Sequence, residues 1–97
     1  MTQHTEAATR AGVIIVGSTS ADLTTFSHRM PARGETIHGD AFSLVLGGKG
    51  ANQAVAVGLA GADAHFVSCV GDDLFHDMVV ESLTEAGVHI EHLRTVP

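Results

Sequence analysis

The chain has 97 residues, of which 44% are hydrophobic and 16% charged, and its eleven acidic and five basic residues give a net charge of −6. This length allows one domain or a part of one, and the composition excludes a disordered chain. The negative charge disfavours nucleic acid as a partner and no apolar run reaches the roughly 18 residues that span a membrane, so we expect a soluble, cytoplasmic protein with neither partner.

The first half of the chain predicts a strand followed by a small β insertion. Residues 1–11 lack the cationic start and apolar core of a secretory signal and predict a flexible leader. Residues 12–18, GVIIVGS, form an apolar, β-branched run that predicts a strand of a parallel sheet, buried on both faces. Residues 21–46 contain short, weakly apolar pieces between the turns MPARGE and HGD, and they predict a β flap over a site or a partner surface.

The next element predicted is a helix that opens on a glycine-rich turn. The sequence GGKG at 47–50 precedes apolar residues at helical spacing, and Gly61 suits the cap at the helix end. The residues at this spacing are Ala51, Ala54, Val55 and Leu59. Residues 64–70 then predict a second buried strand, in which the lone Cys69 is a buried structural thiol.

A second helix and a third strand complete the pattern. The helix is expected to start at Asp72 or Asp73 as N-cap and to stop at Gly87, with Phe75, Met78, Val79, Ser82, Leu83 and Ala86 on its inner face. Residues 90–96 alternate weakly and predict a third parallel strand. The order of elements predicts an open, mainly parallel α/β sheet flanked by helices, with residues 12–97 in one unit that includes the flap.

Polar residues that suit a ligand lie at two places. Ser20 and Asp22 follow the first strand, and ligands of open α/β sheets bind beyond the carboxyl ends of strands. An ionised Asp22 can accept hydrogen bonds from two neighbouring hydroxyls, which suits a polyol. In the turn at 47–52, GGKGAN, glycines allow close backbone approach and Asn52 offers both a donor and an acceptor. The alternatives are that Asp22 caps a turn, that the glycines make a tight connection and that Lys49 is solvated.

Two known phosphate-binding motifs and a metal site are not supported. The turn is no Walker A loop, because Gly50 rather than Ser or Thr follows Lys49 and Ser43 stands where the first glycine belongs. It also lacks the third glycine of the dinucleotide fingerprint, where Gln53 stands. Only His89 and His92 are close among seven histidines, and no cysteine is nearby, so surface histidines are expected.

Together, GVIIVGSTSAD, MPARGETIHGDAFSLVLGGKGANQAVAVGLAGA and HFVSCVGDD resemble the N-terminal part of the ribokinases in the PfkB-type superfamily of carbohydrate kinases. The resemblance runs from Gly12 to the C-terminus, and GGKGANQAVA is its most specific element. It implies that Asp22, Gly48, Lys49 and Asn52 contact the sugar, ribose or a related pentose. It also implies that the β flap is a lid that pairs with a second lid in a homodimer.

The same resemblance implies an enzyme that uses ATP and Mg²⁺, and it leaves a monovalent-cation requirement open. It places the catalytic base, the anion hole and the nucleotide pocket after Pro97, so no catalytic residue is expected in this chain. Ser20 stands where the family usually has an Asn, Arg33 replaces a proline, and His76 replaces a glycine. The alternatives are therefore an inactive sugar-binding or dimerising fragment, or a kinase for another pentose or a nucleoside.

Overall fold

The sheet is built around one central strand, β4. The computed structural model describes residues 12–97, so the leader expected at residues 1–11 lies outside the described residues. The strands of this sheet are β1 (Gly12–Val16), β4 (Asp63–Gly71), β5 (Val88–His89) and β6 (Leu93–Val96). Strand β1 pairs with β4 from Gly12↔Asp63 to Val16↔Val67, and this pair is parallel. Strands β5 and β6 each pair with β4 in parallel as well. The predicted parallel pairing of the first two strands is confirmed.

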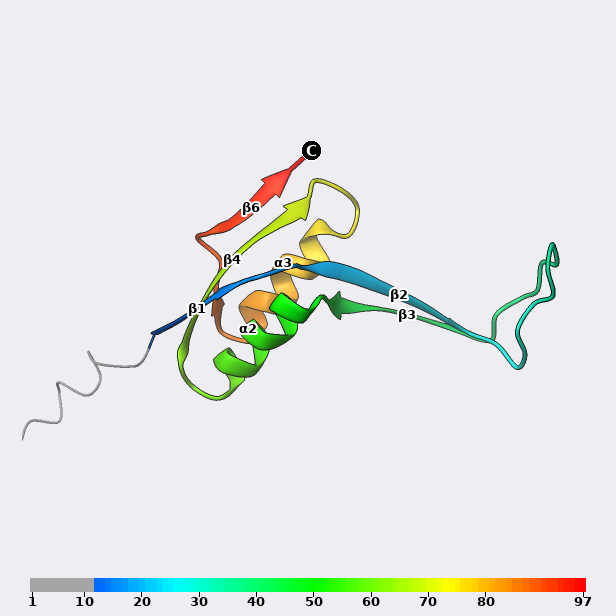
Figure 1. Ribbon diagram of the computed structural model, residues 1–97, viewed down its shortest axis with the longest axis horizontal. Helices are drawn as coiled ribbons and strands as arrows, with labels where there is room; N and C mark the ends of the chain where they lie inside the picture. The colour runs from blue at the N-terminus through cyan, green and yellow to red at the C-terminus, as the bar shows by residue number, and fades with distance from the viewer. Residues whose placement is uncertain (1–11) are drawn as a thin grey trace, which may run out of the picture.

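Both helices cover the same face of this sheet (Figure 1). They are α2 (Lys49–Leu59) and α3 (His76–Glu85). Along β4 the buried residues alternate, since Ala64, Phe66 and Val70 face the helices. They form the core with residues of both helices and of β1 and β5, including Ala51, Ala54, Val79, Leu83, Ile15 and Val88. The fully buried side chains of Phe66 and Leu83 make the largest contributions to this core.

The other face of the sheet is open, and this corrects two expectations. In β1 only Ile15 is buried, whereas Ile14 and Val16 are 72% and 76% exposed. Cys69 is exposed as well. The prediction of a first strand buried on both faces and the prediction of a buried Cys69 are both wrong, because alternate residues of β1 and β4 point away from the helices and no described element covers them.

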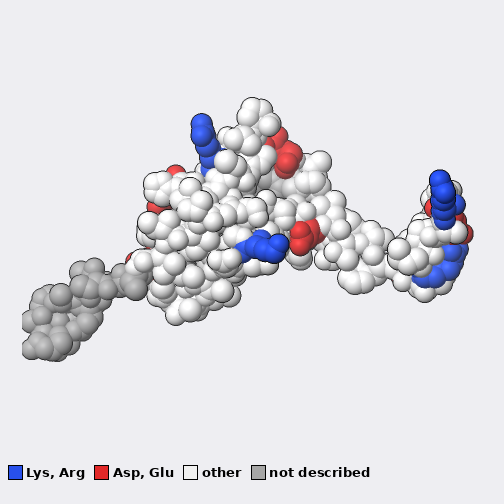
Figure 2. Space-filling model, in the orientation of Figure 1, with Lys and Arg blue, Asp and Glu red and all other residues white. Residues whose placement is uncertain are grey.

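Between β1 and α2 the chain makes a long antiparallel hairpin that projects from the body (Figure 1). Its strands are β2 (Ser20–Phe26) and β3 (Ala41–Gly47), paired from Ser20↔Gly47 to Phe26↔Ala41. Each strand has seven residues, longer than the short pieces expected. Asp22 is their one charged residue, and Figure 2 shows charged side chains gathered instead at the far end of the hairpin.

An ion pair closes the tip of the hairpin. The Arg29 guanidinium donates two hydrogen bonds to the Glu35 carboxylate, at 2.7 and 2.8 Å, and the Ala32 amide donates a third at 2.8 Å. These bonds, first the one from Arg29 and then the one from Ala32, lower the pKa of Glu35 to about 2. The exposed tip is therefore held by charge-assisted hydrogen bonds rather than by a core.

The ends of the elements differ in detail from the sequence predictions. Helix α2 ends at Leu59 and is followed by Gly61 with φ +94°, as expected, but Leu59 is 73% exposed. Its inner face consists of small residues, and a Cβ at Gly58 would overlap the carbonyl oxygen of Ala86 beside α3. Leu59 has the predicted helical spacing but lies outside the buried face, and the close approach of the two elements leaves room only for Gly58 there.

Helix α3 starts later than predicted, and the third strand is shorter. Its N-cap is Phe75, so Asp72 or Asp73 as N-cap was wrong. Asp73 Oδ1 accepts a hydrogen bond from the Phe75 amide at 2.9 Å, which uses the carboxylate in the turn before the helix. Of the strand expected at residues 90–96, only Leu93–Val96 forms a strand, β6, and the short β5 (Val88–His89) lies before the expected range. Within residues 12–97, neither helix is long and apolar enough to cross a membrane.

Candidate functional site

The candidate site lies where the glycine-rich turn packs against the connection between β1 and β2. A Cβ on Gly50 would lie 2.7 Å from backbone atoms of Gly17, so the two backbones are in direct contact. Gly48 has φ +95°, a conformation that favours glycine, and a Cβ there would lie 2.7 Å from the Ser18 carbonyl oxygen. The Ala51 amide donates to that same oxygen at 3.1 Å. The glycines therefore fix the start of α2 against the end of β1.

Asp22 and Ser20 lie on one face of the hairpin base, beside this turn. Ser20 pairs with Gly47 in the β2–β3 register, and the Ser20 hydroxyl donates to Asp22 Oδ1 at 3.1 Å. The Asp22 carboxylate lies directly over Gly47, where a Cβ would overlap it. Asp22 is thus inside β2 rather than directly after the first strand, and it is exposed to solvent. An exposed carboxylate with one hydroxyl partner keeps acceptor positions for a ligand.

The start of α2 adds the remaining predicted residues. The backbone amide of Asn52 donates to the Gly48 carbonyl at 3.0 Å, and Lys49 is the first residue of the helix. The helix has no side-chain cap and no acidic residue in its first turn. Within the described part of the chain, the side chains of Lys49 and Asn52 make no hydrogen bond or ion pair, and both residues are exposed. Uncapped N–H groups at a helix start are suited to oxygen atoms of a ligand.

The structure therefore brings all five predicted residues to one place. Ser20 and Asp22 come from β2, Gly48 precedes α2, and Lys49 and Asn52 come from its first turn. They are connected through the contact of Asp22 with Gly47 and through the hydrogen bond between the Asn52 amide and Gly48. This grouping depends on the glycine contacts with Gly17 and Ser18, which the sequence pattern alone does not show.

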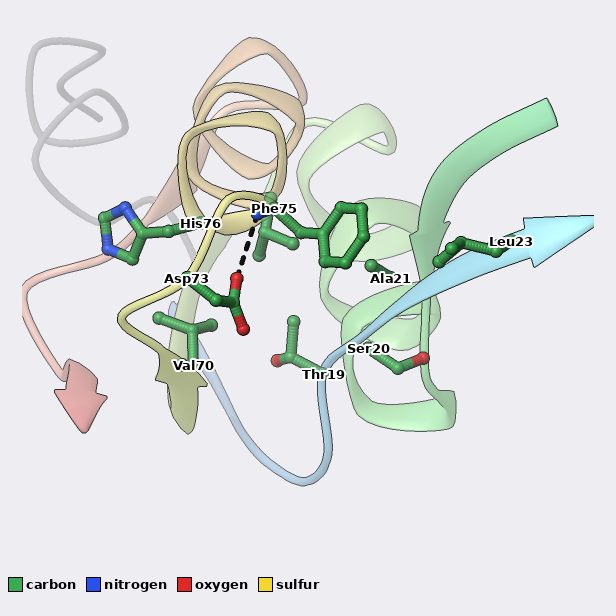
Figure 3. A pocket seen from close by; sticks show the side chains of 10 residues that line it. Thr19, Ser20, Ala21, Leu23, Val70, Asp73, Phe75 and His76 are labelled. Carbon is green, nitrogen blue, oxygen red and sulfur yellow. Dashed lines mark hydrogen bonds between the residues drawn. The ribbon is translucent and has the colours of Figure 1, made fainter. Parts of the chain in front are cut away.

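A cavity of about 250 Å³ lies next to this group, at the carboxyl ends of β1 and β4. Figure 3 shows the side chains of Thr19, Asp73 and Phe75 around it. Ser20 also lines the cavity, but its side chain is directed away from that of Thr19 (Figure 3), and Asp22, Gly48, Lys49 and Asn52 do not line it. Sequence reasoning missed the lining residues Thr19, Asp73 and Phe75 as part of a site, although the turn sequence GDD marked the end of the strand before Asp73 and Phe75.

Hydrogen bonds stabilise the walls of the cavity. Thr19 Oγ1 lies 2.8 Å from Ser68 Oγ, which connects the loop after β1 to β4. The His76 ring lies between Asp77 Oδ1 and Thr95 Oγ1, each at 3.0 Å, and so connects the start of α3 to β6. These contacts engage polar groups of the wall, whereas Asp22 and the helix start keep free hydrogen-bonding positions.

The grouped residues have the chemistry of a binding site. A carboxylate, an amide and helix-start N–H groups recognise hydroxyls by hydrogen bonds, and each bond to a charged group is worth about 1.5–3 kcal/mol. Residues 12–97 contain no group of three or more His, Cys, Asp or Glu side chains that could hold a metal ion. His89 instead pairs with Asp63 at 3.2 Å and stacks on His65, with ring centres 4.6 Å apart.

Comparisons with known proteins agree with this fold. A ribokinase from Lactococcus lactis is 42% identical over 86 residues, covering 88% of this chain and 29% of that protein. A deoxyribokinase from Salmonella typhi is 38% identical over 85 residues, covering 88% of this chain and 28% of that protein. The structure of the Arabidopsis thaliana ribokinase complexed with ribose and ATP matches 90% of this chain with a TM-score of 0.80 and 34% identity.

The chain spans about 28% of the length of these relatives. The matched structures confirm the predicted fold class, a parallel α/β sheet flanked by helices. The family model described as pfkB family carbohydrate kinase matches residues 10–97, nearly the whole chain. The chain therefore belongs to the pfkB family of carbohydrate kinases.

Proposed function

We propose that this chain forms the sugar-binding part of an ATP-dependent carbohydrate kinase that converts ribose and ATP to ribose 5-phosphate and ADP. The observation that carries the proposal is the exposed Asp22 carboxylate, fixed beside the uncapped start of α2. Similarity to ribokinases supports it, including one whose structure was solved with ribose and ATP. In this proposal residues 12–97 are the N-terminal part of one α/β domain, and the β2–β3 hairpin is its lid.

Each predicted residue has a role that follows from its chemistry. Asp22 accepts hydrogen bonds from two ring hydroxyls, and the Asn52 amide both donates to and accepts from a third. The backbone of Gly48 forms the wall of the site, where a side chain would block the approach of the sugar. Lys49 supplies a donor at the helix start, and Ser20 orients the Asp22 carboxylate through its 3.1 Å hydrogen bond.

Phosphoryl transfer needs a nucleotide, a metal ion and a base positioned around the transferred group. Residues 12–97 contain no group of three or more His, Cys, Asp or Glu side chains around a possible metal position. Because the chain spans about 28% of the length of its relatives, we assign the sites for ATP, Mg²⁺ and any monovalent cation, as well as the catalytic base, to the rest of the enzyme. The contribution of residues 12–97 is to bind and orient the sugar.

Deoxyribose is a second candidate substrate, favoured by a specific feature of the site. Ser20 stands where the family usually has an Asn, and its hydroxyl donates to Asp22. One hydroxyl offers fewer hydrogen bonds to a sugar than an amide does. A deoxyribokinase is also among the relatives, at 38% identity. Because Ser20 already donates to one oxygen of Asp22, a sugar with one hydroxyl fewer still suits this carboxylate.

A chimeric enzyme tests the proposed function. Residues 12–97 replace the matching segment of the Lactococcus lactis ribokinase, which is 42% identical over 86 residues, and release of ADP is measured with ribose, deoxyribose, fructose and adenosine. We expect turnover with ribose or deoxyribose, strongly reduced by Asp22→Ala. A folded chimera that phosphorylates fructose or adenosine in preference to both pentoses would contradict the assignment. Gly12→Ala is the matched control, because a Cβ there meets no atom within 4 Å.

We further propose that the enzyme is cytoplasmic and forms a homodimer through its hairpins. The hairpin strands carry several exposed apolar side chains: Leu23 at 52%, Phe42 at 61% and Val45 at 50%. An exposed apolar surface of this kind is typical of a protein interface. Leu23 and Phe42 lie on one face of the hairpin and Val45 lies on the other, beside Asp22, and pairing of two hairpins through either face would bury the apolar side chains of that face. Analytical ultracentrifugation of the chimera tests this, and a monomer at every concentration would contradict it.

A further inference from the structure

We infer that Gly47 and Ser20 form a seat for the Asp22 carboxylate, and that Gly47 is a positioning residue that acts on the sugar through Asp22. This inference rests on the proposed function, because it concerns how the same site holds its substrate. Ser20 and Gly47 together are named the carboxylate seat.

The carboxylate seat arises from the hairpin register. Ser20 and Gly47 are directly opposite in the antiparallel pair, and Asp22 is two residues further along β2, on the same face. The Asp22 side chain leans back across the strands, so its carboxylate lies over the Gly47 backbone. Its Oδ1 accepts the Ser20 hydroxyl at 3.1 Å. One partner thus holds the carboxylate by a hydrogen bond and the other leaves the space that the carboxylate occupies.

Glycine is required at position 47 for space and not for backbone conformation. The positive-φ glycines of the described chain are Gly34, Gly48, Gly61 and Gly87, so Gly47 has an ordinary backbone that alanine can adopt. The three heavy atoms nearest to a Cβ on Gly47 all belong to the Asp22 carboxyl group. Alanine at this position would therefore displace that carboxylate before it touched anything else.

This geometry distinguishes Gly47 from its neighbours in the glycine-rich turn. A Cβ at Gly48 or Gly50 would meet the backbone of the β1–β2 connection, which cannot move without a change in the fold. A Cβ at Gly47 meets a side chain that can rotate away. We therefore expect Gly47→Ala to leave the fold intact and to move the one charged group of the hairpin strands out of position.

The test is a double-mutant cycle in the chimeric enzyme, with Gly47→Ala, Asp22→Ala, the double variant and Gly12→Ala as control. We expect Gly47→Ala to raise the KM for ribose about tenfold, the loss of one charge-assisted hydrogen bond, with kcat and the KM for ATP changed less than about twofold. Ser20→Ala should raise the same KM by a smaller factor. In the Asp22→Ala background, Gly47→Ala should have no further effect, because the carboxylate that it displaces is gone.

Unfolding of the 97-residue chain gives a second readout that needs no sugar. Gly47→Ala should lower the unfolding midpoint of the parent chain but not that of Asp22→Ala, where the new methyl occupies the vacated space. Additive effects of the two substitutions in both assays would overturn the carboxylate seat. A second outcome is that Gly47→Ala lowers the unfolding midpoint only when Asp22 is present but leaves the KM for ribose unchanged. This result would confirm the contact between Gly47 and Asp22. It would overturn the role of Gly47 in the sugar site and count against the proposed function.

Discussion

Gly50→Ala tests whether the contact between the glycine-rich turn and the β1–β2 connection determines the position of the site. Gly50 is inside helix α2, where replacement of glycine by alanine ordinarily stabilises a helix by about 1 kcal/mol. Here, however, the new Cβ would lie 2.7 Å from two backbone atoms of Gly17 and from the Ser18 amide nitrogen. Backbone atoms cannot rotate aside, so the helix start must move.

The opposing effects give the expected sign and size. Overpacking a close backbone contact costs about 1–3 kcal/mol. Movement of the helix start also lengthens the 3.1 Å hydrogen bond from the Ala51 amide to the Ser18 carbonyl, which is worth about 0.5–1.5 kcal/mol. These costs exceed the helix-propensity gain, so we expect a net destabilisation of about 1–3 kcal/mol.

Urea unfolding followed by circular dichroism measures this change in the 97-residue chain at several concentrations, and thermal unfolding measures it in the chimera. Gly12→Ala, for which no atom lies within 4 Å of the new Cβ, should change stability by less than about 0.5 kcal/mol. A Gly50→Ala chain as stable as its parent, or more stable, would show that helix propensity wins and that the contact is loose.

Four further outcomes are expected from the structure. Asp22→Ala in the chimera should weaken ribose binding by about 1.5–3 kcal/mol in calorimetry, and an equal loss of ATP affinity would show that Asp22 is structural. Ser20→Asn should raise ribose affinity, and an unchanged preference across pentoses, hexoses and nucleosides would place Ser20 outside the specificity-determining contacts. The pKa of Glu35 is lowered from 4.5 to about 2, first by the hydrogen bonds from Arg29, so the stability that its pair with Arg29 contributes is complete above pH 4.5 and is lost as the pH falls through 2. The Ala32 amide shift in NMR should titrate with a midpoint near pH 2, and this midpoint should move up towards 4.5 in Arg29→Gln. The purified 97-residue chain should self-associate in size-exclusion chromatography, because Ile14 and Val16 are 72% and 76% exposed on the open sheet face. It should also show only background ADP release with ribose and ATP, and a monodisperse, active monomer would contradict both expectations.

The sequence was sufficient for the order and direction of the main elements. The β-branched run in β1 and the glycine-rich start of α2 are local signals, and they predicted the parallel β1–β4 pair and the helix to within about a residue. Local patterns do not show which layers cover a strand. For that reason the exposure of Cys69 and of Ile14 could not be anticipated from apolar runs that are typical of buried strands.

The candidate site was predictable in its residues but not in its geometry. Asp22 and the turn at 47–52 stood out by residue type and position, yet their contact depends on the β2–β3 register, which joins residues more than 20 positions apart. The hydrogen bond from Ser20 to Asp22 was also beyond the pattern, since the same residues fit a turn equally well. Long-range contacts such as Thr19 with Ser68 create the adjacent cavity and leave no local signal.

The hairpin is joined to the body of the protein at its base, so a tilt about that base would move its far end more than its near end. Its pivot is the Ser20↔Gly47 pair, and the rise of a strand, about 3.4 Å per residue, puts Asp22 about 7 Å and Phe26 about 20 Å from that pivot. A hairpin that tilts as a rigid body therefore moves Asp22 about one third as far as Phe26. In the proposed lid, a movement of about 3 Å at Phe26 would therefore shift Asp22 by about 1 Å, which is enough to weaken a hydrogen bond to the sugar, so opening of the far end and release of the ligand would be coupled.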